Sequence, residues 1–222
     1  MADATITAVG WSRDGIATRI AADLENGWRV NLGIGIPLLI PPHVPAGVDV
    51  ILHSENGALG LGPPPPEGEG DPDLTDAGKN FVTLAVGASI FDSATSFALV
   101  RGGHLDLAVL GGLQVSANGD LANWNVPGGS IGVGGAMDLV AGARRIWVAM
   151  EHTDRKGDPK ILKECSFYLT GRGVVDRVYT NLGVFDLENG LTLVECAPGV
   201  TVDYIAERTD APFEVLEKIE ER

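Results

Sequence analysis

The segment that most constrains the fold of this chain is Leu105 to Leu110, an apolar run interrupted only by Asp106. A strand with one wet face alternates apolar and polar side chains, whereas an unbroken apolar run is typical of a strand covered on both faces. Such strands belong to parallel or mixed sheets whose connections are helices. We therefore expect an α/β fold with an open mixed sheet and helices on both faces.

Other segments predict further elements of this fold. Helices are expected over residues 12–26, 92–102, 136–143 and 201–208, and strands over residues 28–32, 48–52, 81–86, 145–150 and 174–179. The turn dipeptides Asn118-Gly119 and Asn189-Gly190 predict two hairpins. Because the chain shows neither an internal repeat nor a linker, residues 1–222 are expected to form a single domain.

The helix boundaries rest on capping residues and on helical spacing. Ser12, Asp92 and Thr201 each precede a helix that their side chains can cap. Apolar residues on the first helix recur at intervals of four, which places a charged set in solvent: Arg13, Asp14, Arg19, Asp23 and Glu25. Prolines between residues 37 and 45 limit the next helix to one or two turns.

The segment from His53 to Gly62 carries the strongest chemical signal. Glu55 follows an expected strand and precedes three glycines, Gly57, Gly60 and Gly62. Glycines let the backbone turn sharply and bring N–H groups close to a ligand, so Glu55 could serve as a positioned nucleophile or a general base. A surface glutamate in a glycine-rich loop fits this spacing equally well.

Ser54-Glu55-Asn56-Gly57, followed by Gly60 and Gly62, resembles the active-site signature of the family I coenzyme A transferases. Five further segments resemble motifs of the same family: 31–37, 102–112, 119–124, 134–140 and 193–195. The resemblance is closest to the B (beta) subunits of 3-oxoacid and 3-oxoadipate CoA-transferases. It implies a CoA-transferase-like domain that moves CoA from succinyl-CoA to acetoacetate or 3-oxoadipate, and it leaves the choice of acid open.

The resemblance implies that Glu55 is the nucleophile of a ping-pong reaction. Glu55 would form an acyl anhydride and then a glutamyl-CoA thioester, so coenzyme A is both substrate and covalent intermediate, and no tightly bound cofactor or metal is expected. Backbone amides should stabilise each oxyanion, from the set Gly57, Gly60 and Gly62 or from Gly134, Gly135 and Ala136.

The first glycine loop and one lysine complete the expected site. Asn31, Gly33 and Gly35 form the loop, and in the family residues at the positions of Asn31 and Lys79 help to hold the active carboxylate or the CoA. Asn56, beside Glu55, belongs to the same expected set. The alternatives are a turn asparagine and a solvated lysine in a helix-like stretch.

Two other functions remain open from the sequence. Gly128 to Gly132 spells G-x-S-x-G, which would make Ser130 a nucleophile and His152 its base in an acyl-CoA or ester hydrolase. That motif needs a strand directly before the serine, whereas Pro127 stands there, so coincidence is favoured. A non-catalytic partner subunit is the third hypothesis.

Composition and chain content bear on partners and location. The chain has 30 acidic and 16 basic residues, a formal net charge of −14, which argues against a nucleic-acid or anionic-membrane partner. The absence of a leader-like start or a long apolar run, with Cys165 and Cys196 far apart, predicts a cytoplasmic protein with buried thiols.

The family that this chain resembles has two homologous halves, so an A (alpha) subunit partner is expected, in an α2β2 heteromer. The loop 125–132 departs from the 3-oxoacid pattern toward the 3-oxoadipate one.

Overall fold

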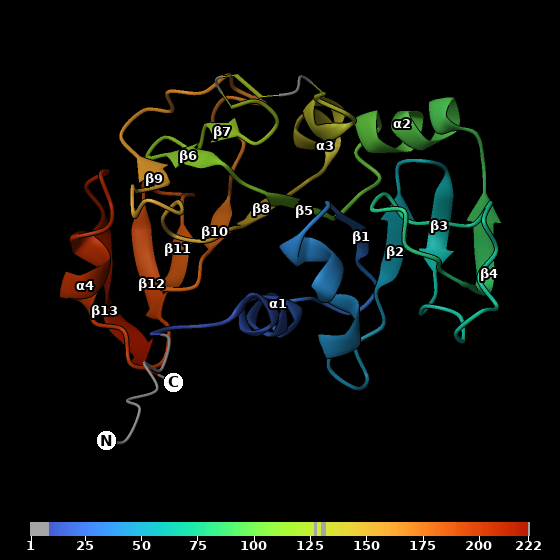
Figure 1. Cartoon of the computed structure of the whole chain (residues 1–222), viewed down its shortest axis with the longest axis horizontal. Coiled ribbons are helices and arrows are strands. Elements are labelled where there is room, and N and C mark those ends of the chain that lie inside the picture. Colours follow the sequence, from blue (N-terminus) through green and yellow to red (C-terminus); the bar gives the residue numbers. More distant parts are fainter. Residues whose placement is uncertain (1–8, 127, 130–131, 222) are drawn as a thin grey trace.

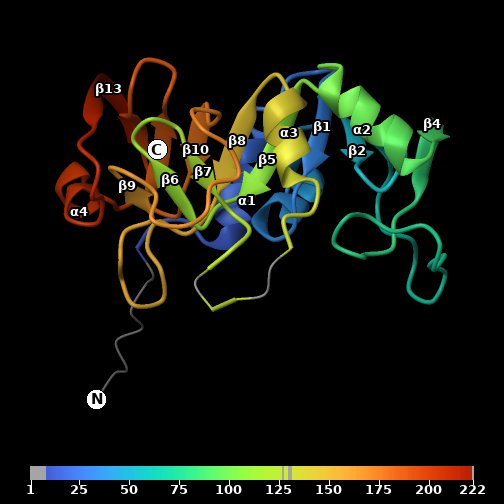
Figure 2. The same cartoon turned by 90° about the horizontal axis from the view of Figure 1, so that it is seen from above.

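The computed structural model describes residues 9–126, 128–129 and 132–221, which form a ten-stranded mixed sheet with a smaller sheet beside it (Figures 1 and 2). In spatial order the large sheet contains β13 (Glu214–Glu221), β12 (Thr192–Cys196), β11 (Gly183–Asp186), β10 (Arg177–Tyr179), β8 (Ile146–Ala149), β5 (Leu107–Gly111), β1 (Arg29–Leu32), β2 (Ile51–Ser54), β3 (Ala58–Leu61) and β4 (Leu84–Ile90). The small sheet has the order β7 (Leu121–Ala122), β6 (Gln114–Ser116) and β9 (Ile161–Leu162).

Helices cover both faces of the large sheet, as predicted. The helix α1 (Arg13–Ala21) lies on one face with two 3₁₀ turns, η1 (Ile36–Leu39) and η2 (Pro41–His43), while α2 (Ser93–Arg101) and α3 (Ala136–Gly142) lie on the other (Figure 1). The short helix α4 (Val202–Ala206) packs near β12 and β13 (Figure 1). The fold class expected from the sequence is confirmed.

The centre of the sheet is parallel and fully buried. Strands β2, β1, β5, β8 and β10 run parallel to one another, and Leu107 to Leu110 are at most 3% exposed. One apolar core lies on the α1 side and includes Val109, whereas the other lies on the α3 side and includes Leu110. The apolar residues of β5 therefore contribute side chains to two cores, one on each face of the strand.

The helix starts follow the predicted caps. Ser12 accepts a hydrogen bond from the Gly15 amide, Asp92 from Thr95 and Thr201 from Tyr204. The predicted end of the first helix is wrong, because α1 ends at Ala21 and the chain turns there. Arg19 and Asp23 were expected in solvent, but their side chains are 15% and 22% exposed.

Arg19 and Asp23 are partly buried because they contact strands that are distant in the sequence. Asp23 accepts hydrogen bonds from Arg177 (2.9 Å) and Tyr179 (2.7 Å) of β10 and pairs with Arg19 (2.7 Å). Arg19 also pairs with Glu195 of β12 at 2.7 Å. Helical spacing alone carries no information about charged partners more than 150 residues away.

Several strands begin later than predicted. Residues 48–50 lie outside the sheet, where Asp49 bonds to Asn26 and Gly27, and β2 starts at Ile51. The segment before β4 is held by Thr83, whose backbone bonds to Gly62 and Pro63. Neither β9 nor β13 was predicted. Strand β13 has the highly charged sequence EVLEKIEE and pairs in parallel with β12.

Candidate active site

Glu55 lies in the tight turn between the antiparallel strands β2 and β3. The Gly57 amide donates to the Ser54 carbonyl at 3.0 Å and closes the turn. Gly57 has φ of +125°, and a β-carbon there would lie 2.1 Å from the Phe91 carbonyl oxygen, so glycine is required. This turn presents the half-buried Glu55 at the carboxyl end of β2, beside β1.

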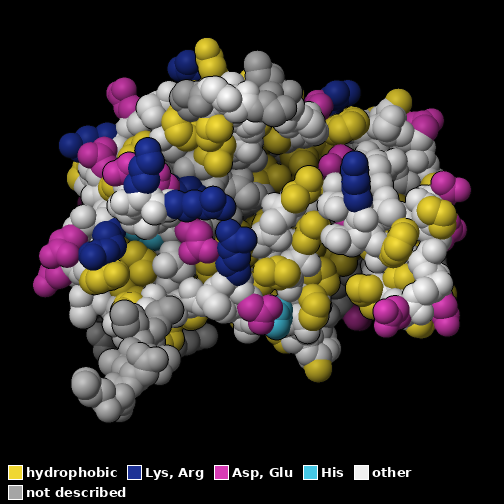
Figure 3. Space-filling model, in the orientation of Figure 1, with side chains coloured by type: hydrophobic (Ala, Val, Ile, Leu, Met, Phe, Trp, Pro, Cys, Tyr) yellow, Lys and Arg dark blue, Asp and Glu magenta, His cyan; other side chains and the backbone are white. Residues whose placement is uncertain are grey.

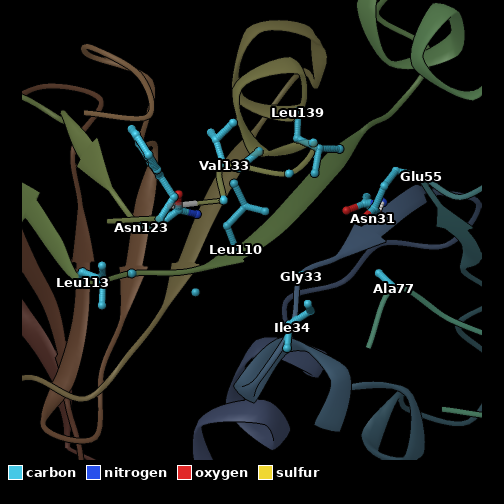
Figure 4. A pocket seen from close by; sticks show the side chains of 17 residues that line it. Asn31, Gly33, Ile34, Glu55, Ala77, Leu110, Leu113, Asn123, Val133 and Leu139 are labelled. Carbon is cyan, nitrogen blue, oxygen red and sulfur yellow. Dashed lines mark hydrogen bonds between the residues drawn. The ribbon is translucent and has the colours of Figure 1, made fainter. Parts of the chain in front are cut away.

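A pocket of about 400 Å³ opens in front of Glu55 (Figure 4). Its wall includes the ends of β1 and β5, which are parallel strands, and ligands of open α/β sheets bind beyond the carboxyl ends of such strands. Glu55 and Asn31 lie together on one side in Figure 4, and Asn123 lies across from them. The lining residues are Asn31, Gly33, Ile34, Glu55, Ala77, 110–113, Asn123, Trp124, 132–136 and Leu139.

Asn31 is the side chain that holds Glu55. It is fully buried on β1, and its Nδ2 atom lies 3.4 Å from Glu55 Oε2, 3.2 Å from the His53 carbonyl oxygen and 3.1 Å from His53 Nδ1. Three acceptors around Nδ2 fix the orientation of the amide. Within the described part of the chain, Asn31 Oδ1 has no hydrogen-bond partner.

His53 supports Asn31 from behind. Because Nδ1 accepts from Asn31, the proton is on Nε2, which lies 3.0 Å from Ser96 Oγ on α2. Ser96 in turn donates to the Ser54 carbonyl at 3.5 Å. Burial lowers the pKa of His53 to about 4, so the ring is neutral near pH 7 and Nδ1 can remain an acceptor. A hydrogen-bonded chain thus runs from Ser96 through His53 and Asn31 to Glu55.

From the sequence, His53 was only the first residue of the segment that carries Glu55, and Ser96 was not singled out. The parallel pairing of β1 and β2 sets Asn31 directly beside His53. That register depends on the assembled sheet, so residue spacing could not have revealed the pair. Asn123 and Trp124 were notable in the sequence for their motif alone, and the structure adds that they line the pocket.

The segment Gly134-Gly135-Ala136 lies next to Glu55. A β-carbon on Gly135 would lie 3.5 Å from Glu55 Cγ and 2.9 Å from the Phe97 ring. All three residues line the pocket, and Ala136 begins α3. Of the two predicted sets of amide donors, this one is placed beside the carboxylate.

The other predicted set of amide donors, Gly57, Gly60 and Gly62, lies away from the pocket. The Gly57 and Gly62 amides donate to the carbonyls of Ser54 and Thr83, and a β-carbon on Gly60 would lie 3.0 Å from Ala88 Cα on β4. None of the three lines the pocket. These glycines let the turn and the neighbouring strands approach closely, and the expectation that they face an oxyanion does not match this geometry.

Three other predicted residues lie around the site. Gly33 lines the pocket, and Gly35, with φ of +100°, follows the lining residue Ile34. Asn56 donates its side-chain amide to the Thr75 carbonyl at 2.8 Å instead of contacting Glu55.

Lys79 is not in a helix, which corrects the helix-like assignment. It is exposed in a turn with φ of +65°, a conformation that suits the tight turn closed by the Lys79 amide on the Asp76 carbonyl. Lys79 lines a second pocket of about 960 Å³ together with His53 and Ser54. The two pockets adjoin, because Ala77 lines both.

The hydrolase alternative finds no support at His152. Both ring nitrogens of this fully buried histidine are engaged, Nδ1 with Thr180 Oγ1 at 3.0 Å and Nε2 with Thr209 Oγ1 at 2.9 Å. Burial also lowers the pKa of His152 to about 4. Ser130, the other half of that hypothesis, lies outside the described residues.

Metal-binding clusters and membrane-spanning helices are both absent from the described residues. No group of three or more His, Cys, Asp or Glu side chains in this part of the chain is placed to hold a metal ion. Nor does any of its helices have the length and hydropathy needed to cross a bilayer.

Comparisons with known proteins found similar chains. The family profile described as Coenzyme A transferase matches residues 13–208. The B subunit of the probable succinyl-CoA:3-ketoacid coenzyme A transferase of Bacillus subtilis is 52% identical over 210 residues, covering 94% of this chain and 97% of that protein. The B subunit of the 3-oxoadipate CoA-transferase of Acinetobacter baylyi is 48% identical over 203 residues, covering 90% of this chain and 94% of that protein.

A solved structure shows the same fold. The acyl-CoA transferase YdiF apoenzyme from Escherichia coli O157:H7 superposes with a TM-score of 0.75 at 24% identity. The match covers 94% of this chain and 42% of the crystallised one, so this chain spans less than half of that protein.

Proposed function

The chain belongs to the coenzyme A transferase family, and we propose that it is the B subunit of an enzyme that moves CoA from succinyl-CoA to a 3-oxo acid through Glu55. The acceptor is acetoacetate or 3-oxoadipate, in line with the two acid classes named for the relatives. The partner is an A subunit, in an α2β2 assembly. We place the enzyme in the cytoplasm.

The observation that carries this proposal is the setting of Glu55. Its carboxylate lies in a pocket at the carboxyl ends of parallel strands, with one oxygen held by the buried amide of Asn31. A carboxylate fixed in this way loses little conformational freedom on reaction, and a nucleophile in a near-attack geometry reacts faster. The second oxygen is the atom that we propose attacks the substrate.

The first half-reaction takes two steps. Glu55 attacks the thioester carbonyl of succinyl-CoA, the C–S bond breaks, and the products are a glutamyl-succinyl anhydride and the CoA thiolate. The thiolate then attacks the glutamyl carbonyl of the anhydride. This step releases succinate and leaves a thioester between Glu55 and CoA. No free acyl group is lost to water.

The second half-reaction reverses these steps with the other acid. The carboxylate of the 3-oxo acid attacks the Glu55 thioester and releases the CoA thiolate, which then attacks the acyl carbonyl of the new anhydride. The products are the 3-oxoacyl-CoA and the free Glu55 carboxylate. Every tetrahedral intermediate carries an oxyanion, and backbone amides of Gly134, Gly135 and Ala136 are the proposed donors.

Steady-state kinetics of the complex with its A subunit test this reaction. Initial rates with succinyl-CoA varied at several concentrations of acetoacetate, and separately of 3-oxoadipate, should give parallel double-reciprocal lines. Converging lines would contradict a covalent CoA intermediate. Steady release of free CoA without either acceptor would favour a hydrolase, and the ratio of kcat/KM for the two acids identifies the acceptor.

A further inference from the structure

The two outer strands of the large sheet differ sharply in charge. The outer strand β13 carries five charged residues among eight, whereas β4, with the sequence LAVGASI, carries none among seven. An outer strand exposes unpaired N–H and C=O groups, and proteins protect such edges with charged side chains because uncharged edges pair with other chains. The sequence of β13 contains such charged residues, and that of β4 contains none.

The unprotected strand also exposes large apolar side chains. Val86 is fully exposed, Ile90 is 68% exposed and Leu84 is 39% exposed. Phe81, just before β4, adds a ring that is 48% exposed. Strand β4 stands at the outer end of the sheet in Figure 1, and Figure 3 shows apolar side chains at that end of the molecule with acidic ones around them. An edge of this kind is suited to receive a strand from a partner.

Local charge distinguishes between the partners that could bind there. Residues 63–92, which contain β4 and the loop before it, carry six carboxylates and one lysine. A second copy of this chain would bring the same acidic loop to the interface, and like charges brought together oppose association. A different chain with basic residues beside its own edge strand would be attracted instead.

The exposed edge is joined directly to the catalytic turn. Ile90 pairs with Ala58 on β3, and the Phe91 amide donates to the Gly57 carbonyl at 2.9 Å. Gly57 closes the turn that holds Glu55. Since neighbouring strands lie about 4.8 Å apart, a strand added to β4 would lie roughly 10 Å from β3. A strand bound there would join the part of the sheet, β4 and β3, that closes the Glu55 turn.

We propose that β4 is the docking strand for the A subunit, which adds an edge strand flanked by basic residues and so extends the sheet next to Glu55. This inference rests on the proposed two-subunit function. It specifies β4 as the surface of this chain that binds the A subunit, and a basic surface on the A subunit that binds β4.

The test compares matched lysine substitutions at the two edges. The double variant Val86→Lys/Ile90→Lys alters β4, and Val215→Lys/Leu216→Lys alters β13, where the two replaced side chains are 44% and 48% exposed. Each variant is co-expressed with the cognate A subunit, and its assembly is measured by native mass spectrometry and its affinity by titration. Circular dichroism of each isolated chain checks that it is folded.

We expect the β4 variant to bind its partner at least about tenfold more weakly than the wild type and the β13 variant to bind normally. Hydrogen exchange should slow in the peptide 84–90 when the wild-type complex forms, and exchange in 214–221 should not change. Wild-type assembly with unchanged exchange in β4, or normal assembly of a folded β4 variant, would overturn the docking surface while leaving the transferase proposal intact. Homodimers of this chain joined through β4 would overturn it as well. Failure of the wild type to bind its cognate partner would overturn both proposals.

Discussion

Asn31 Nδ2 lies 3.4 Å from Glu55 Oε2, so the amide of a fully buried side chain on β1 reaches the carboxylate in the turn after β2. The contact depends on the parallel pairing of these two strands, which sets Asn31 beside His53, the second residue before Glu55. The amide restricts the rotation of the carboxylate and leaves one oxygen for chemistry. Catalysis by Glu55 should therefore depend on the side chains that orient its carboxylate.

Replacing Asn31 with Ala should lower kcat on the order of tenfold to a hundredfold, because the carboxylate is no longer held in its reactive orientation. The loss should appear in the rate of the first half-reaction, measured by stopped-flow release of succinate from the two-subunit complex. An Asn31→Ala enzyme that transfers CoA at the wild-type rate would show that the contact has no role in positioning Glu55.

His53 offers a test of the chain behind Asn31. His53→Leu removes one of the three acceptors around Asn31 Nδ2 and should lower kcat severalfold, whereas His53→Gln can accept from Asn31 and donate to Ser96 and should retain most of the activity. Thermal unfolding of both variants separates this effect from general destabilisation. Equal losses in the two variants, at equal stability, would contradict a hydrogen-bonding role.

Stability should also fall in mild acid. Burial lowers the pKa of both His53 and His152 to about 4 from an ordinary value near 6.5. The unfolded chain therefore binds protons that the folded chain excludes, so the free energy of unfolding should decrease as pH falls from about 6.5 to about 4. Urea denaturation across this range measures the slope. His53→Gln should show a shallower slope than the wild type, and an identical slope would contradict the assignment.

Gly135 is predicted to tolerate no side chain. A β-carbon there would lie 2.9 Å from the Phe97 ring and 3.5 Å from Glu55 Cγ. Gly135→Val should therefore displace the nucleophile and lower kcat/KM by about a hundredfold or more. Gly132→Ala is the control, because Gly132 lines the same pocket but a β-carbon there would meet no atom of the described residues within 4 Å. Equal activities of the two variants would contradict the crowding at Gly135.

The half-buried ion cluster around Asp23 should matter for stability and not for chemistry. Asp23→Ala leaves Arg19, Arg177 and Tyr179 without their shared acceptor and should cost about 2–4 kcal/mol in the free energy of unfolding. Asp14→Ala, which breaks an exposed pair with His43, should cost less than about 1 kcal/mol. Urea denaturation of the two variants measures the difference, and similar costs would contradict the cluster's role.

These residues also show what the sequence could and could not predict. Local signals were sufficient for the caps at Ser12, Asp92 and Thr201 and for the buried strand through Leu107. Contacts between distant segments were not predictable. Such contacts keep Arg19 and Asp23 out of solvent, and they pair the Gly62 amide with the Thr83 carbonyl.

In the site too, local signals were predictable and contacts between distant segments were not. The motif around Glu55 drew attention to one segment, and the structure supplied His53 and Ser96, which support the Asn31 side chain that holds Glu55. Lys79 shows the limit of a local pattern, because its stretch looked helical in sequence, whereas the turn closed on Asp76 decides its conformation. The edge strand β13 was missed because its dense charges conceal the alternation that is typical of a strand.

The central claim is that Glu55 carries CoA, and the most direct measurement is peptide mass spectrometry of the two-subunit complex after mixing with succinyl-CoA. We expect that the peptide containing Glu55 gains the mass of CoA less one water, that the 3-oxo acid removes this adduct, and that Glu55→Ala never forms it. A complex that transfers CoA while its Glu55 peptide stays unmodified, or whose Glu55→Ala variant remains active, would contradict it.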